Sequence, residues 1–139
     1  MSLDKLFKEG HLKKIAPSIE RAEKSIEVAK RYLSQAKQTL DIKTYDLVII
    51  AAYSCIFHTS RAILFVDGIG ERSHFAIYEY LKEKHGEFGK DIINAFDLYR
   101  KLRHSVAYGL DTRIEKKDAE KIIEFAEEFL ERTKDQLDL

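Results

Sequence analysis

Apolar side chains recur at steps of three and four positions through residues 19–40. The repeating positions are Ile19, Ala22, Ile26, Ala29, Leu33, Ala36 and Leu40. This spacing is that of an α-helix with one apolar face, because about 3.6 residues make one turn. Pro17 fits the first turn of such a helix, where its missing N–H is no loss. The pattern therefore predicts an amphipathic helix over this range.

The next segment, residues 43–66, is apolar on nearly all sides and predicts a central, buried helix. Its longest apolar run, residues 47–57, is followed by His58 and Arg61, so it is too short to span a bilayer. The glycines of residues 67–70 tolerate a positive φ, which favours a turn that ends the helix. We therefore expect a buried core helix and no contact with a membrane.

Further helices are predicted in the second half of the chain. Ser73 is placed to cap a short helix over residues 73–84. Longer helices are expected over residues 88–107 and from residue 115 onward, with a short N-terminal turn over residues 2–9. No segment of useful length alternates with period two, so no sheet is expected. The fold prediction is a single all-α domain over residues 1–139, an up-and-down four-helix bundle with one or two shorter helices.

Composition and charge narrow the range of functions. The chain has 24 basic and 24 acidic side chains, so its formal net charge is zero. A general nucleic-acid coat protein would carry a large positive excess, so any contact with nucleic acid has to be local. The lone Cys55 has no disulfide partner and no apolar leader opens the chain, so we expect a cytoplasmic protein. Scarce Asn and Gln beside abundant Lys, Glu and Ile are typical of a thermophilic source.

The candidate chemistry lies in Tyr99-Arg-Lys-Leu-Arg-His-Ser-Val-Ala-Tyr108-Gly, at the end of a predicted helix. One helical turn separates Arg100 from His104, so the two share a face, which Tyr108 extends. Arginine is a permanently charged, bidentate ligand for phosphate, and histidine is the side chain whose ordinary pKa lies near neutrality. Together these residue types could hold a phosphodiester and move a proton beside it.

Each residue of this segment has an expected role. Arg103 is the predicted phosphate clamp and His104 the predicted acid–base group, and these two are the candidate catalytic residues. Arg100 and Tyr108 are the candidate substrate-binding residues. Tyr108 is assigned to binding because a phenol with an ordinary pKa of about 10 is a poor base. Structural interpretations stand beside these roles. Cations suit the C-terminal end of a helix dipole, and Tyr108 could close the end of the bundle.

The other histidines favour structural roles. His58 and Arg61 lie three positions apart on the predicted central helix, and either face the same cleft or pair with an acidic residue. His74 follows a predicted cap and is expected to satisfy the start of a helix. His74 and His85 have no HExxH motif or carboxylate cluster with them, so neither a metal site nor a cofactor is expected.

Several short motifs resemble one family in their order and spacing. Residues 51–64, Ala-Ala-Tyr-Ser-Cys-Ile-Phe-His-Thr-Ser-Arg-Ala-Ile-Leu, are similar to the central helix of HEPN-domain proteins. Residues 68–74, with two glycines and a Ser-His pair, match a segment of one branch of small prokaryotic HEPN proteins. Residues 103–109 look like that branch's R-N-x-A-D-Y signature, and residues 115–130 resemble its closing acidic helix. The resemblance covers roughly residues 15–135.

The resemblance implies an activity and partners. Many HEPN domains are metal-independent endoribonucleases, and many are toxins paired with a minimal nucleotidyltransferase. They dimerise so that Arg and His of both subunits line one cleft. In the ribonuclease branches the motif is Arg, four to six residues, then His. In this chain Tyr108 follows Arg103 at that spacing, and His104 follows Arg100 after only three residues.

Two hypotheses therefore stay open. The first is an endoribonuclease toxin of a toxin–antitoxin pair, which acts on RNA or nucleotides at a composite site of a homodimer. The second is a non-catalytic helical homodimer that binds a nucleotidyltransferase partner or a nucleotide. The Arg103-His104 pair favours the first hypothesis, whereas the departure from the ribonuclease spacing favours the second.

Overall fold

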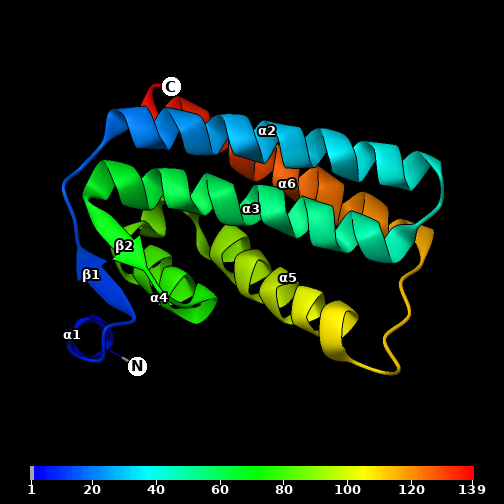
Figure 1. The fold of residues 1–139 in the computed structure, drawn as a ribbon, viewed down its shortest axis with the longest axis horizontal. Helices are drawn as coiled ribbons and strands as arrows, with labels where there is room; N and C mark the ends of the chain where they lie inside the picture. The colour runs from blue at the N-terminus through cyan, green and yellow to red at the C-terminus, as the bar shows by residue number, and fades with distance from the viewer. Residues whose placement is uncertain (1) are drawn as a thin grey trace.

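The computed structural model describes residues 2–139, and four long helices form its main body (Figure 1). Their bounds are Ile19–Asp41 for α2, Tyr45–Asp67 for α3, Lys90–Tyr108 for α5 and Lys116–Leu137 for α6. Helices α2 and α3 form an antiparallel hairpin along the long axis of the molecule, and α6 packs against both. The predicted all-α bundle is confirmed.

Short elements gather at one end of the bundle (Figure 1). They are α1 (Leu3–Lys8), β1 (Leu12–Lys14), β2 (Ile69–Glu71), α4 (His74–Lys84) and the 3₁₀ turn η1 (Gly86–Phe88). Strands β1 and β2 pair antiparallel, with Lys13 opposite Gly70. The prediction of a simple turn at residues 68–70 and of no sheet was wrong. Strands of three residues are too short to show the period of two from which a strand is recognised.

Helix α3 is the core of the bundle, as its sequence predicts. Tyr53, Ile56 and Ile63 are among its buried side chains, and each is at most 1% exposed. By length and composition alone α3 could cross a membrane. However, 61% of its apolar stretch is buried inside the bundle. Burial by neighbouring helices is what the core helix of a globular protein shows.

The helix ends follow their sequence signals, with one shift. Gly68 ends α3 in the left-handed conformation with φ of 76°, and the Ser73 hydroxyl caps α4 by accepting a backbone hydrogen bond of 3.1 Å. Helix α2 begins at Ile19 and is capped by Ser18, so Pro17 precedes the helix and does not lie in its first turn. Ile19 is correspondingly 54% exposed, although the apolar stripe predicted it to be buried.

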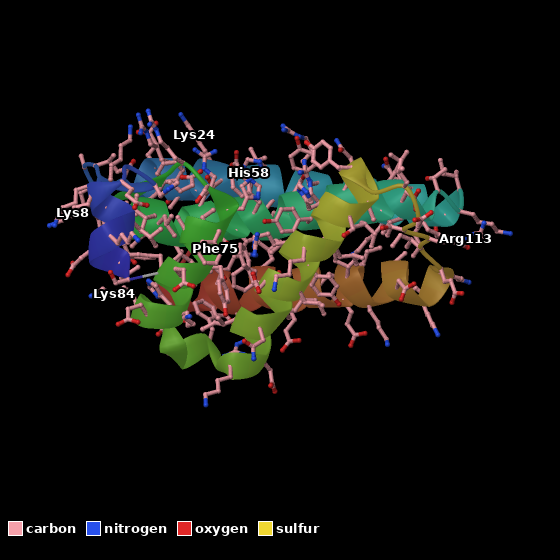
Figure 2. The ribbon with its side chains drawn as sticks, turned by 90° about the horizontal axis from the view of Figure 1, so that it is seen from below. Lys8, Lys24, His58, Phe75, Lys84 and Arg113 are labelled. Atoms are coloured by element: carbon pink, nitrogen blue, oxygen red, sulfur yellow. The ribbon has the colours of Figure 1, made fainter. Side chains whose placement is uncertain are left out.

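Helix α5 crosses the bundle at an angle and does not run along it (Figure 2). Its buried residues all lie in its first half and end with Phe96, and none of residues 97–108 is buried. Leu98 is 61% exposed, and Leu110 just beyond the helix is 98% exposed. The second half of α5 therefore presents its side chains to the surface, close to the start of α4.

Candidate functional site

A groove of about 510 Å³ lies between the start of α4 and the second half of α5, and we name it the Arg103 groove. The residues that line it are Ser73, His74, Phe75, Arg100, Arg103, His104 and Tyr108. All four site residues predicted from the sequence therefore line one surface. The start of α4 adds a serine, a histidine and a phenylalanine, of which Phe75 is labelled in Figure 2.

Helical spacing brings His104 and Tyr108 together. Their ring centroids lie 4.9 Å apart at an angle of 50°, because residues four apart share a helix face. Gly109 then ends the helix, and its N–H donates to the Ser105 carbonyl at 2.7 Å. A Cβ at position 109 would lie 2.5 Å from that carbonyl oxygen, so the turn that ends the histidine-bearing face requires glycine.

The two arginines are held differently. Arg100 donates from Nε and Nη2 to the same Asp97 oxygen, at 3.0 and 2.7 Å, and its guanidinium lies 5.4 Å from the Phe75 ring centroid. Asp97 also pairs with Lys101 at 3.1 Å. Burial favours a higher pKa for Asp97, but the hydrogen bonds and charges of its two cations outweigh burial and lower this pKa. Neither ion pair uses Arg103, and within residues 2–139 no other carboxylate pairs with it, which leaves that guanidinium available for an anion.

His74 is the groove residue that sequence reasoning missed, since it was assigned only to the start of a helix. Its Nδ1 lies 2.8 Å from the hydroxyl of Tyr53, and its ring stacks on Phe57 at 4.4 Å and 15°. The Ser73 cap fixes where α4 begins and therefore where His74 stands. The signal that could have identified His74 is the Ser-His pair that follows the glycine loop.

Electrostatics keep His74 neutral and Tyr53 protonated. Burial lowers the pKa of His74, and the charges of Arg103 and Arg100 lower it further. Burial raises the pKa of Tyr53 well above its ordinary value. We assign Tyr53 as the donor to Nδ1, because this is the hydrogen bond that satisfies its buried hydroxyl within residues 2–139. The proton of neutral His74 then lies on Nε2, where it can be donated to a bound anion.

His58 does not line the Arg103 groove. It lies on α3 and stacks on Tyr32 of α2, with ring centroids 5.6 Å apart. Arg61 lies 3.1 Å from Glu71, so within residues 2–139 the acidic partner considered from the sequence exists for the arginine and not for the histidine. His85 contacts two carboxylates, and within residues 2–139 no group of three or more His, Cys, Asp or Glu side chains is arranged to hold a metal ion.

A larger hollow of about 810 Å³ lies against α1 and β1. Its lining residues are Leu3, Asp4, Phe7, Lys8, Lys14, Ile69, Tyr80 and Lys84. These residues include no histidine or cysteine, so the hollow has no side chain whose ordinary pKa suits proton transfer near neutrality. The Arg103 groove is smaller, but it combines phosphate ligands with proton-transfer groups.

The fold and the groove together define a class of protein, namely an all-α bundle with a basic groove that carries histidines. The HEPN domain family matches residues 22–136. A protein of Methanocaldococcus jannaschii named "Putative toxin MJ0605" is 32% identical over 120 residues, which cover 81% of this chain and 85% of that protein. The chain belongs to the HEPN family. The matched range contains every residue of the Arg103 groove and leaves α1 and β1 outside it.

Proposed function

We propose that this protein is a metal-independent endoribonuclease that cleaves RNA in the Arg103 groove and acts as the toxin of a toxin–antitoxin pair. One observation carries the proposal, namely that two arginines and two histidines line a single groove. RNA brings its own nucleophile, the 2′-hydroxyl, so cleavage needs a phosphate site and a proton-transfer group. The name of the Methanocaldococcus relative supports the assignment as a toxin.

In the proposed reaction the 2′-oxygen attacks the adjacent phosphorus, and the bond from phosphorus to the 5′-oxygen breaks. The products are a 2′,3′-cyclic phosphate and a 5′-hydroxyl. His104 accepts the proton of the 2′-hydroxyl, while Arg103 and the Nε2–H of His74 hold the phosphoryl oxygens on which negative charge increases. Arg100 is fixed by Asp97 and adds a second positive charge at the groove wall.

The leaving 5′-oxygen needs a proton from a second acid. A homodimer that joins two Arg103 grooves would supply it from the second copy of His104 and make the site composite. Two exposed leucines support this arrangement, because Leu98 and Leu110 lie on and just beyond the groove-bearing half of α5, which the described helices leave uncovered. Large apolar side chains exposed on and just beyond the helix that carries the groove favour a surface for a protein partner there.

The alternative function is a non-catalytic homodimer that binds a minimal nucleotidyltransferase or a nucleotide. The position of Tyr108 favours it. This phenol stands at the spacing from Arg103 where the ribonuclease branches have histidine, and it is 68% exposed at the edge of the groove. A phenol with an ordinary pKa of about 10 can donate a hydrogen bond to a phosphate but is a poor base at neutral pH.

The test is cleavage of a mixed RNA substrate in EDTA by wild type, Arg103→Ala and His104→Ala, with Lys101→Ala as the matched control. Lys101 lies on the same helix, but it pairs with Asp97 and does not line the groove. We expect wild type and the control to leave cyclic phosphate ends. The rate with His104→Ala should be lower by roughly 10²- to 10⁴-fold, and Arg103→Ala should lose cleavage as well. No cleavage by a folded, dimeric wild type would favour the alternative.

A further inference from the structure

A second groove, of about 360 Å³, lies between α2 and α3, and we name it the Arg61 groove. Its lining includes Arg21, Lys24, Ser25, His58, Arg61 and Phe65. The cations come from two helices and no carboxylate lines the groove, although Glu71 lies beside Arg61 outside the lining and offsets part of its charge. Lys24 also meets Glu20 at 3.3 Å, an exposed pair of little strength. Figure 2 shows Lys24 and His58 near each other on this face.

Phe65 brings two arginines together in this groove. The guanidinium of Arg21 lies 5.9 Å from the Phe65 ring centroid, and that of Arg61 lies 5.2 Å from it. Glu71 Oε1 lies 3.1 Å from Nε of Arg61, but the N–H does not point at this oxygen and makes no hydrogen bond. Both guanidinium groups therefore lie beside one ring in the same groove, so an anion bound in this groove would be stabilised by both.

A chain of ring contacts joins the two grooves. His58 stacks on Tyr32 at 5.6 Å and 6°, and it meets Phe57 edge-on at 5.1 Å. Phe57 in turn stacks on His74 at 4.4 Å. Phe57 therefore lies between the two grooves without lining either, because it contacts His58, which lines one of them, and His74, which lines the other.

Arginine charges act on the imidazoles on both sides of Phe57. Burial lowers the pKa of His58, and the charges of Arg61 and Arg31 lower it further. The pKa of His74, across Phe57, is lowered in the same way by burial and by two arginines. Both imidazoles are therefore neutral near pH 7 and suited to stacking, while the arginines beside them carry the positive charge.

We propose that the Arg61 groove is a second nucleotide-binding site for the single-stranded RNA whose scissile phosphate lies in the Arg103 groove. Arg21 and Arg61 hold a phosphate outside the cleavage site, and the ring of His58, which lines the groove and stacks on Tyr32, receives a base. The inference that this groove binds a nucleotide rests on the residues of the groove. The inference that the nucleotide belongs to an RNA cleaved in the Arg103 groove rests on the proposed function. Single strands are bound by such combinations of rings and cations, because every base has a stacking face and every nucleotide a phosphate.

The test uses the full chain and a single-stranded RNA of about 12 nucleotides, methylated on its 2′-hydroxyls so that it cannot be cleaved. The variant Arg21→Ala/Lys24→Ala removes two groove cations on the surface of α2. The control Lys30→Ala/Lys37→Ala removes two exposed cations from the same helix outside the groove. Arg61 is left in place because its ring and carboxylate contacts make it part of the packing.

Binding is measured by fluorescence anisotropy across a range of salt concentrations. We expect the groove variant to bind the RNA roughly tenfold more weakly, and the slope of log K against log salt to fall by about 0.7 for the lost phosphate contact of Arg21. A dinucleotide, which fills only the Arg103 groove, should bind to the groove variant and to wild type alike. The control variant should bind both ligands as wild type does.

The outcomes separate this proposal from the proposed function. If the groove variant binds the long strand as tightly as wild type, the second site does not exist, whether or not wild type cleaves unmodified RNA. The second site is also wrong if duplex RNA of the same sequence competes as well as the single strand. If the groove variant loses affinity while wild type cleaves nothing, the second site stands and the nuclease function is wrong.

Discussion

The hydroxyl of Tyr53 lies 2.8 Å from Nδ1 of His74, and the two rings stack with centroids 5.6 Å apart at 18°. Tyr53 belongs to the core helix α3 and is 1% exposed, whereas His74 is the first residue of α4. The contact therefore fixes a groove residue to the most buried part of the bundle. A partly buried hydrogen bond of this kind holds the imidazole in one orientation and one tautomer.

The pKa of His74 should rise when Arg103 is removed. After burial, the charge of Arg103 is the largest cause that lowers this pKa, because a nearby cation disfavours the imidazolium. We expect Arg103→Ala to move the pKa of His74 upward, toward its ordinary value of about 6.5. The measurement is an NMR titration of the His74 ring. Lys101→Ala removes the same charge from an exposed position on α5 and serves as the control. An unchanged pKa in Arg103→Ala would mean that the guanidinium is not beside the ring.

The lowered pKa of His74 also predicts that the fold loses stability on acidification. In the folded protein this pKa lies below the value of about 6.5 that an unfolded chain has. Between the two values the unfolded chain binds more protons, so the free energy of unfolding rises with pH and falls as the pH drops. His58 contributes with the same sign, since its pKa is also lowered.

Urea unfolding from about pH 5 to pH 7 checks this pH dependence. We expect His74→Phe to be less stable overall, because the Tyr53 hydroxyl loses its acceptor, yet to show a shallower loss of stability toward acid. A variant with the same pH slope as wild type would show that His74 is not the group that titrates.

The helices could be predicted from the sequence because each carries its own apolar period or caps. The Arg100, His104 and Tyr108 face was predictable for the same reason, since a helix places residues four apart side by side. The sheet of β1 and β2 was not predictable, because its strands have three residues each and pair across 55 positions or more of sequence, as Lys14 does with Ile69.

The missing part of the candidate site depends on contacts between elements. Tyr53 and His74 lie 21 positions apart and on different helices, so no local period relates them. Only the packing of α4 against α3 and α5 brings His74 to the groove. The pairing of Arg100 with Asp97 is a different case, because these residues are three apart on one helix and their spacing alone would have indicated an ion pair.

Gly68→Ala should destabilise the protein, whereas Gly86→Ala should not. Gly68 has φ of 76°, and a Cβ there would lie 2.8 Å from the carbonyl oxygen of Ile15 and 2.9 Å from Cγ of Pro17. The strain of the left-handed backbone and the clash together should lower the free energy of unfolding by about 1–3 kcal/mol. A Cβ at Gly86 meets nothing within 4 Å, so its substitution should change stability by less than about 0.5 kcal/mol. Denaturant unfolding of the two variants side by side makes the comparison, and equal midpoints would contradict it.

Cys55 should report how often the bundle opens. Cys55 is 0% exposed, and burial raises the pKa of its thiol to about 12. In the native protein a disulfide reagent therefore cannot reach the sulfur, and the reactive thiolate does not form. Labelling should therefore require opening of the bundle around α3. Where the bundle closes faster than the reagent reacts, the labelling rate reports the population of the open form. A loss of about 1.4 kcal/mol in the free energy of unfolding should raise the labelling rate about tenfold. Gly68→Ala should therefore label faster than wild type, by the factor that corresponds to its loss of unfolding free energy. Fast labelling of the wild-type protein in the absence of denaturant would contradict the burial of Cys55.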